Sequence, residues 1–486
     1  MKSQYNFLIE YEDGERVDMD SVGLWVESFH IYSPNVVRKK SEIQGKHGAT
    51  QTSSRLAERR IDINFQVETD SPMDLDDLKH TIYSIFYRDK PYKIIRDLTP
   101  SKYLFACQEG EYDFDNITSS DADFSITLTM LDPFIYGQKR EMVINNPSAP
   151  FVLRNYGVEE TPPYFSIELS GPTTLLDIIG EEDYMRIGRP STVDDTTFKE
   201  YENVLTEDGF NLTGWTSALF TPDGGTKTGT MGVDSGNFIA TGFGSGTNWH
   251  GPTLSKSLNG SVVIPDFKVR AYFDVGSNPS QRARTEVYLL DAASNVIGKV
   301  AAVLRKSSGE VDVEIALRNG SNVHYVVSMD WTYKEFFGYM DIIKKGKEFT
   351  FYIAQQGYRA DGRVYTRHKP KFTFQDDNSE FQKSLAAIGM HIGTHSNYPT
   401  PTRAKIRKIE VEKINTQPEG IPFIGTTGDV FEFFHGESEI YKNGDLFYGK
   451  DFGARFFHLK PGENVFLANP PEVIREIRAE WRDKGT

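Results

Sequence analysis

A glycine-rich stretch near the middle of the chain carries side chains suited to binding a carbohydrate. Residues 242–251 read GFGSGTNWHG and contain Trp249 and His250. An aromatic face packs against the apolar face of a pyranose ring, and polar groups beside it bond the sugar hydroxyls. Trp249 and His250 are therefore our first candidate carbohydrate-binding residues. The competing interpretation is that such aromatic residues belong to the core of a β-sandwich.

Two further stretches combine tyrosine with polar or charged neighbours. The sequence YRADGRVYTRH contains Tyr358 and Tyr365, and the sequence HSNY ends in Tyr398. We add these three tyrosines to the candidate carbohydrate-binding set, with core packing or loop anchoring as the competing interpretation. For Trp215 and Trp331, which lie outside glycine-rich loops, we favour a place in the core.

Three carboxylates are weak candidates for a structural calcium site. Ca²⁺ takes several oxygen ligands, and Glu207, Asp208 and Glu410 would meet if the first and last strands of one domain pair. A solvated surface is the interpretation that we prefer. We therefore expect no firm metal site and no cofactor.

A hydrolase is the enzymatic alternative, because a glycosidase needs two carboxylates about 5 to 9.5 Å apart across a cleft. The chain has 69 Asp and Glu residues, so the sequence leaves such a pair open. It contains no HExxH, GxSxG or P-loop motif, and its one cysteine, Cys107, has no histidine at a recognisable spacing. We therefore expect a protein that is not an enzyme.

The elements that must position these residues are mostly β-strands. Ile61, Ile63, Phe65 and Val67 alternate with polar residues, which predicts a strand with one face in a core and one in water. Similar half-buried strands are expected at 124–130, 165–169, 311–317 and 477–481. One helix is expected over 72–88, capped by Ser71 and stopped before Pro91.

Composition and loops divide the chain into parts. A first domain is expected at 1–140, followed by a polar linker. The segments 151–195 and 421–486 are each too short for an independent core, so we expect them to combine into one domain. Residues 200–415 would then be a domain inserted into a surface loop of that second domain.

Charge and hydropathy exclude several classes of protein. The net charge of −15 makes the chain a poor candidate for sequence-specific or non-specific nucleic-acid binding, which relies on clustered Lys and Arg. The N-terminus has no secretory apolar region, and no apolar run approaches the ~20 residues that span a bilayer. We therefore expect synthesis in a cytoplasm and no membrane partner.

The first domain contains an ordered set of features: the hairpin sequence IQGKHG, the alternating strand at 60–67, the helix ending in YKIIRD, and the strand ADFSITLTMLDPFIY. In this order they resemble the N-terminal belt domain of siphophage distal tail proteins. In that family the hairpin takes part in ring assembly. The resemblance therefore assigns ring assembly to Ile43, Gly45, Lys46 and Gly48.

The second domain resembles the family's galectin-like β-sandwich. The sequences NYG and PYFSIEL look like its start, and GDVFEF, LKPGEN and AEWR look like its end. The insertion opens with GFNLTGW, which is similar to laminin-G-like and carbohydrate-binding modules of jelly-roll fold. The fold that the resemblance implies is mostly β: a belt domain with one helix, and a galectin-like sandwich interrupted by a jelly roll.

The resemblance also implies a function and partners. Distal tail proteins form a homohexameric ring that joins the tail tube protein to the tail-tip proteins, in the virion, without catalysis. An inserted carbohydrate-binding module would add host cell-wall polysaccharide as a partner. A wall-polysaccharide hydrolase and a purely structural spacer or dock remain the alternatives for the insertion.

Basic residues cluster around the expected hairpin of the first domain. They are Arg38, Lys39, Lys40, Lys46, Arg59 and Arg60. They could face DNA passing through a ring, but we favour solvated faces or ion pairs between subunits.

Overall fold

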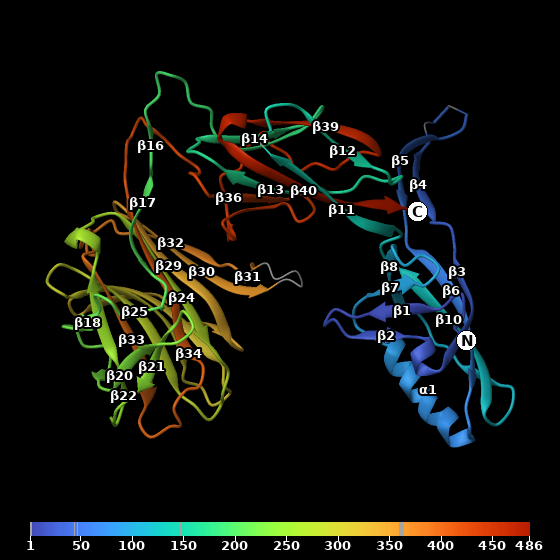
Figure 1. Cartoon of the computed structure of the whole chain (residues 1–486), viewed down its shortest axis with the longest axis horizontal. Coiled ribbons are helices and arrows are strands. Elements are labelled where there is room, and N and C mark those ends of the chain that lie inside the picture. The colour runs from blue at the N-terminus through green and yellow to red at the C-terminus, as the bar shows by residue number, and fades with distance from the viewer. Residues whose placement is uncertain (1, 43, 46, 146, 359–363) are drawn as a thin grey trace. The chain divides into compact units, whose positions relative to one another are not determined.

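The computed structural model describes residues 2–42, 44–45, 47–145, 147–358 and 364–486, without the side chains of 328–331 and 367. Its described residues form 40 strands and one α-helix, so the predicted mostly-β class with one helix is confirmed (Figure 1). The chain divides into two compact units. The first comprises 1–188, 424–443 and 447–486, and the second comprises 189–423 and 444–446.

The first core of the first unit is a helix packed on strongly twisted strands. Its strands are β1 (Phe7–Glu10), β2 (Arg16–Asp18), β3 (Leu24–Ile31), β6 (Arg59–Glu68), β7 (Tyr92–Arg96), β8 (Tyr103–Gln108), β9 (Phe114–Asn116), β10 (Asp121–Met130) and β11 (Ile135–Asn145). Strand β6 lies between β3 and β10. The predicted alternation is observed, because Ile61, Ile63, Phe65 and Val67 are all at most 1% exposed.

The helix α1 (Pro72–Phe86) begins where the sequence predicts and ends two residues before the predicted 88. The Ser71 hydroxyl accepts a hydrogen bond from the Asp74 amide at 3.2 Å, which satisfies one of the free N–H groups of the first turn. Tyr87 already has an extended backbone and donates its N–H to the Tyr83 carbonyl. The apolar face of the helix packs into this core through four buried side chains, Leu75, Ile82, Ile85 and Phe86.

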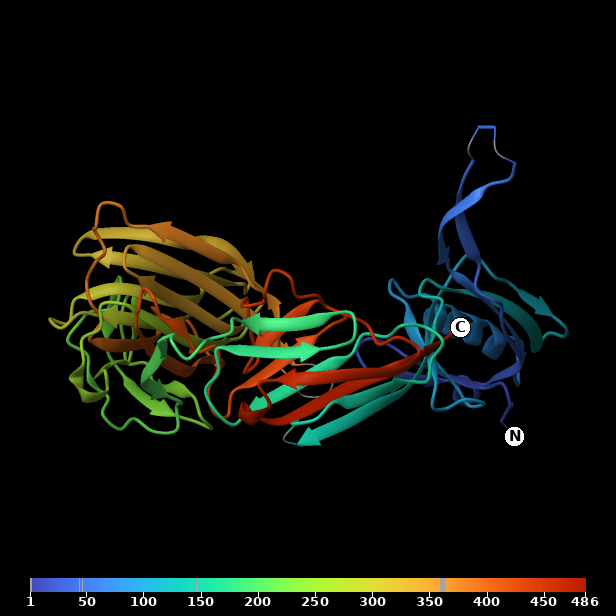
Figure 2. The same ribbon diagram turned by 90° about the horizontal axis from the view of Figure 1, so that it is seen from above.

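A two-stranded hairpin projects from the first unit (Figure 2, blue). Strands β4 (Val36–Ser41) and β5 (Thr50–Leu56) pair only with each other, and all but the last of their residues are exposed. Both outer edges therefore carry backbone groups that are free to pair with another chain.

The second core of the first unit is built from chain segments that precede and follow the second unit in the sequence. Its strands are β12 (Phe151–Asn155), β13 (Tyr164–Leu169), β14 (Leu175–Ile179), β15 (Tyr184–Gly188), β36 (Val430–Phe434), β37 (Glu439–Lys442), β39 (Gly462–Asn469) and β40 (Ile474–Gly485). Strand β13 lies between β36 and β40, and β12 pairs with β39. Phe165 and Ile167 consequently share one core with Phe431 and Phe433.

The second unit is a sandwich of two nine-stranded sheets. The sheet that we call the β34 sheet contains β17 (Tyr201–Glu207), β20 (Thr230–Val233), β21 (Phe238–Gly242), β24 (Phe267–Val275), β29 (Phe336–Lys345), β30 (Glu348–Tyr358), β31 (Val364–His368), β32 (Lys371–Gln375) and β34 (Ala404–Ile414). Its first and last strands, β17 and β34, pair antiparallel. Val269 and Phe273 of this sheet face the core between the layers.

The opposing layer, which we call the β33 sheet, supplies Val287 and Ile315 to the same core. It contains β18 (Thr216–Ser217), β19 (Gly225–Lys227), β22 (Trp249–Gly251), β23 (Thr253–Ser257), β25 (Ala283–Leu290), β26 (Val296–Leu304), β27 (Val311–Asn319), β28 (Asn322–Tyr333) and β33 (Ala387–His395). A parallel pair of short strands, β16 (Thr197–Phe198) and β35 (Ile421–Pro422), lies where the unit begins and ends.

One strand prediction is wrong in a way that bears on the site. The alternation at 311–317 predicts a strand with one face in water, yet β27 is buried on both faces, with Asp312 at 0% and Glu314 at 6% exposure. The segment 218–228 covers this outer face of the β33 sheet. Its Asp223 forms ion pairs with Lys299 at 3.1 Å and Arg318 at 2.6 Å.

Among the described residues, no helix is both long and apolar enough to cross a membrane.

Candidate carbohydrate-binding surface

Trp249 lies on the outer face of the β33 sheet, at the end of its glycine-rich loop. Strand β22 pairs in parallel with β19 and antiparallel with β33, where Trp249 is opposite His395. Directly opposed residues point to the same face of a sheet. The two rings therefore meet edge to face, with centroids 5.2 Å apart.

Tyr398 extends this pair into a row of three rings, which we call the aromatic platform. The His395 and Tyr398 centroids are 6.2 Å apart, and Tyr398 is 43% exposed. Two backbone bonds fix the loops: the Ser396 amide donates to the Asn248 carbonyl at 3.0 Å, and the Tyr398 amide donates to the His395 carbonyl at 3.1 Å. Two of the predicted sugar-binding residues, Trp249 and Tyr398, thus come together through a histidine that was not in the predicted set.

Two arginines of strand β25 and its preceding loop lie against the platform. The Arg282 guanidinium is 4.4 Å from the centroid of Tyr398, and that of Arg284 is 5.6 Å from the centroid of Trp249. Arg284 is only 8% exposed and forms an ion pair with Glu286 at 2.9 Å. The platform therefore offers aromatic rings beside two guanidiniums, of which that of Arg284 is paired with a carboxylate.

His250 does not join the platform. Its neighbour Trp249 points outward, whereas His250 is 3% exposed and its Nδ1 lies 2.9 Å from the Asn248 carbonyl oxygen. Successive side chains of a strand point to opposite faces, so both residues of this pair cannot face one ligand. The structure gives His250 the place of a loop anchor.

Tyr358 and Tyr365 lie on the other sheet. They belong to β30 and β31 of the β34 sheet, where Tyr358 is 59% exposed and packs 5.4 Å from Phe337. Of the predicted stretch that contains them, residues 359–363 lie outside the described part of the chain. These two tyrosines therefore form a separate group from the platform.

The three calcium candidates do not converge. Glu207 accepts hydrogen bonds from Trp215 and Lys256, on the core side of the β34 sheet. Glu410 accepts from Tyr272 at 3.0 Å on the outer side, and Asp208 accepts from the Phe210 amide at 3.3 Å. The predicted pairing of first and last strands holds, but it places Glu207 opposite Ile409 and so leaves Glu207 and Glu410 on opposite faces. Among the described residues, no group of His, Cys, Asp and Glu could hold a metal ion.

A buried charged cluster occupies the centre of the same outer face as the platform. Lys299, 2% exposed, contacts Asp223, Glu286 and Glu314 at 3.1 to 3.3 Å. Burial alone would raise the pKa of Glu314, but Lys299 and Arg305 outweigh it, and the pKa lies below its usual 4.5. Sequence analysis did not identify this cluster, because alternating charges on a strand normally indicate a solvated face.

Two of the predicted ring-assembly residues, Gly45 and Gly48, lie between strands β4 and β5. Gly45 and Gly48 have left-handed backbones, with φ of 86° and 82°, which glycine adopts without strain. Ile43 and Lys46 lie outside the described residues.

The basic residues near this hairpin have different environments. Arg38, Lys39 and Lys40 are exposed on β4. Arg59 is 7% exposed and donates to the carbonyls of Tyr32 and Pro133, so its role is structural. Arg60 pairs with Asp62 at 2.7 Å.

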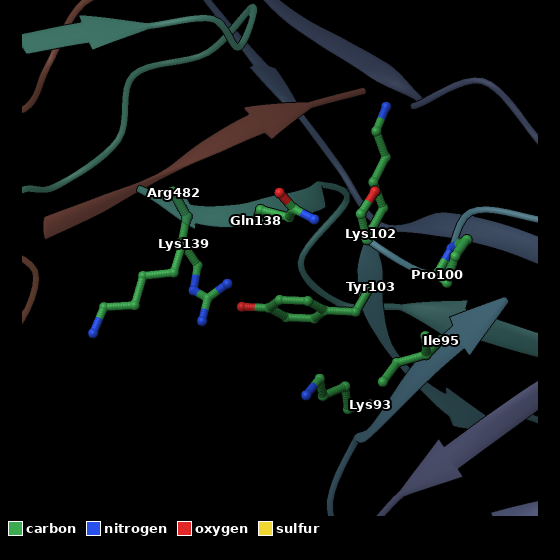
Figure 3. A pocket seen from close by; sticks show the side chains of 9 residues that line it. Lys93, Ile95, Pro100, Lys102, Tyr103, Gln138, Lys139 and Arg482 are labelled. Carbon is green, nitrogen blue, oxygen red and sulfur yellow. The ribbon is translucent and has the colours of Figure 1, made fainter. Parts of the chain in front are cut away.

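A shallow hollow of about 250 Å³ in the first unit is also lined by cations (Figure 3). Lys93 and Arg482 flank the ring of Tyr103 at 4.9 and 5.4 Å, while the Lys102 ammonium points away from it (Figure 3). Lys93 and Lys139 are already neutralised by carboxylates at 2.8 Å each. The hollow is therefore a weaker candidate site than the platform.

Comparison with known proteins finds similarity to both units of the chain. No curated protein matches the chain significantly. Among solved structures, the SPP1 Dit protein is 19% identical over 38% of this chain and 74% of its own, with a TM-score of 0.33. The CBM2 module of the evolved Dit of Lactobacillus casei BL23 phage J-1 is 17% identical over 45% of this chain and 99% of its own, with a TM-score of 0.34.

A β-glucanase of Bacillus licheniformis is 11% identical over 44% of this chain and 99% of its own, with a TM-score of 0.27.

A family model also matches the sequence. It covers residues 23–130 and describes the phage tail protein RIFT-related domain. The match includes the hairpin, helix α1 and strands β3 to β10. Residues 23–130 of this chain are therefore similar to the phage tail protein RIFT-related domain.

Proposed function

We propose that the chain is a distal tail protein, a ring subunit at the tip of a phage tail. The observation that supports this most is the match of residues 23–130 to the phage tail domain. The free edges of hairpin β4–β5 fit a subunit that pairs with neighbours. Its partners would be its own copies in a hexamer, the tail tube protein and a tail-tip protein.

We also propose three domains: a belt domain at 1–140, a galectin-like domain at 151–195 and 421–486, and an inserted jelly roll at 200–415. The mass of the purified chain in solution tests the ring. A mass of six subunits is expected, and a monomer at micromolar concentration would contradict ring formation by this chain alone.

The inserted domain binds a host cell-wall polysaccharide through the aromatic platform. Trp249, His395 and Tyr398 supply three neighbouring rings that meet edge to face, and the exposed Asn248 and Asn397 lie in the same two loops. Aromatic faces with a few polar groups beside them are the usual composition of a saccharide site.

Replacing the tryptophan of the platform tests this function. The Trp249→Ala variant should lose retention of host cells or wall polysaccharide, because the largest face of the platform is gone. Trp25→Ala is the matched control, since Trp25 is a 41% exposed tryptophan of the first unit. Equal retention by the two variants would contradict a site at the platform.

A wall-polysaccharide hydrolase is a second candidate because Glu286 and Glu314 flank Lys299 on the same face as the platform. The burial of both carboxylates opposes this, since Glu286 is 0% and Glu314 6% exposed and each is paired with an arginine, whereas a glycosidase places its carboxylates in an open cleft. Release of soluble sugar from host walls by the purified chain would establish hydrolysis.

A structural spacer is the third possibility for the insertion. Deleting 200–415 separates it from binding: particles that assemble but do not adsorb support host binding. Particles that fail to assemble support a structural role.

A further inference from the structure

Three of the loops around the aromatic platform contain no acidic residue. They are residues 242–251 (GFGSGTNWHG), 276–284 (GSNPSQRAR) and 393–403 (GTHSNYPTPTR). With 69 Asp and Glu among 486 residues, an average stretch of this combined length would hold about four. A fourth loop, residues 218–228, holds Asp223, which is paired with Lys299 and Arg318. The three loops without acidic residues therefore differ in charge from the rest of an acidic chain.

Hydrogen bonds join these loops into one surface. The Ser396 amide donates to the Asn248 carbonyl at 3.0 Å, which links the first loop to the third. The Thr394 hydroxyl donates to the Arg282 carbonyl at 3.1 Å, which links the third to the second. The three stretches that lack carboxylates are thus neighbours in space.

The three arginines of these loops differ in how far their charge is compensated. Arg403 pairs with Asp274 at 2.7 Å and with Glu335 at 2.6 Å. Arg284 is buried and pairs with Glu286 at 2.9 Å. Each of these two guanidiniums is therefore neutralised within the protein.

Arg282 is different. Its guanidinium donates to the backbone carbonyls of Pro279 at 2.9 Å and Gln281 at 2.7 Å, both through the same nitrogen, and lies 4.4 Å from the Tyr398 centroid. In the described part of the chain it has no carboxylate partner, and it is partly exposed. Its remaining N–H groups and its charge are available to a ligand stacked on Tyr398.

We infer that the platform takes an anionic saccharide, one whose sugar carries a carboxylate or phosphate group that Arg282 binds while Trp249 or Tyr398 stacks on the ring. This inference rests on the proposed saccharide-binding function and names the class of its ligand. A planar guanidinium suits both anionic groups, because it offers parallel N–H donors. A neutral sugar would leave that charge without a partner.

Affinity gel electrophoresis of the full chain tests the inference with three polymers. Polygalacturonate carries carboxylates, phosphorylated mannan carries phosphates, and dextran is neutral. At least one anionic polymer should retard the wild-type chain about tenfold more strongly than dextran, as one charge-assisted hydrogen bond allows. The retardation should fall as salt is raised. The polymer that retards the chain shows whether a carboxylate or a phosphate group is bound.

Three variants identify the residue responsible. Arg282→Gln should remove most of the preference for the anionic polymer, and Arg282→Lys should restore part of it. Lys383→Gln, which removes an exposed positive charge elsewhere in the second unit, should leave it unchanged. Unfolding temperatures of all variants establish that they are folded.

The outcomes separate this inference from the proposed function. If neither anionic polymer retards the chain more than dextran, or if Arg282→Gln keeps the full preference, the anionic ligand is excluded, while loss of wall retention in Trp249→Ala still supports the saccharide site. If Trp249→Ala retains host wall as the wild type does, the proposed site itself fails.

Discussion

Replacing Lys299 by methionine tests whether the buried charged cluster holds the β33 sheet together. The ammonium contacts the carboxylates of Asp223, Glu286 and Glu314, and the residue is 2% exposed. Methionine keeps most of the side-chain length and removes the charge. The variant leaves the buried Glu286 and Glu314 and the partly buried Asp223 with one cation fewer between them.

The expected loss of stability follows from what remains around those carboxylates. Removing one partner of a buried ion pair costs about 3–5 kcal/mol. Each carboxylate keeps an arginine: Arg318 on Asp223, Arg284 on Glu286 and Arg305 on Glu314. We therefore expect the lower end, about 3 kcal/mol, which for a unit of this size lowers the Tm by about 6–12 °C.

Differential scanning calorimetry of the full chain measures this change. Hydrogen exchange of peptides from β26 assigns the affected transition to the second unit. Lys383→Met, an exposed lysine of the same unit, is the control and should shift the Tm by less than about 2 °C. A Lys299→Met chain as stable as this control would refute the view that Lys299 holds the three carboxylates.

The difference should also depend on pH. In the wild type the pKa of Glu314 lies below 4.5, because the attraction of Lys299 and Arg305 outweighs burial. A lowered pKa contributes stability above the unfolded value and loses it as the pH falls through the folded value. Without Lys299 the pKa of Glu314 is lowered less, so the variant loses less stability than the wild type when the pH falls. The difference in Tm between the wild type and Lys299→Met should therefore decrease from pH 7 to pH 4. An increase in that difference would contradict the role given to Glu314.

Two further substitutions test the helix cap of the first unit and the core of the second unit. Ser71→Ala removes the hydroxyl that accepts from the Asp74 amide and should destabilise the first unit by about 1 kcal/mol in urea denaturation; Thr at this position should restore most of it, and an unchanged midpoint for alanine would exclude the cap. Trp215→Ala should cost about 3–5 kcal/mol, because the indole is 8% exposed and packs on Phe238, yet the folded variant should still retain wall polysaccharide. Loss of retention in folded Trp215→Ala chains would place this tryptophan in the binding site.

The secondary structure of the first unit was largely predictable because its signals are local. Alternation marks strand β6, and a serine followed by proline marks the start of α1. The Asn443-Gly444 turn is equally local: both residues have left-handed backbones, and the Phe447 amide donates to the Ile440 carbonyl at 2.8 Å to close the hairpin.

The outer face of the β33 sheet was not predictable in the same way. Its strands carry charges at alternate positions, a pattern typical of a face in water. Whether that face is covered depends on residues 218–228, which lie far from β27 in the sequence and contribute Asp223 to Lys299. Only the tertiary fold shows that these alternating charges neutralise one another inside the molecule.

The candidate site shows both the reach and the limit of reasoning from residue type. Composition directs attention to the glycine-rich loop, but it treats Trp249 and His250 as equivalent. Residues 249–251 form a strand, and adjacent side chains of a strand point to opposite faces of the sheet. Trp249 and His250 therefore cannot both lie on the outer face. The same rule brings His395, directly across from Trp249, onto the ligand side. The platform is thus determined by strand register, and the anionic ligand that we infer for it rests on Arg282, whose guanidinium has no carboxylate partner among the described residues.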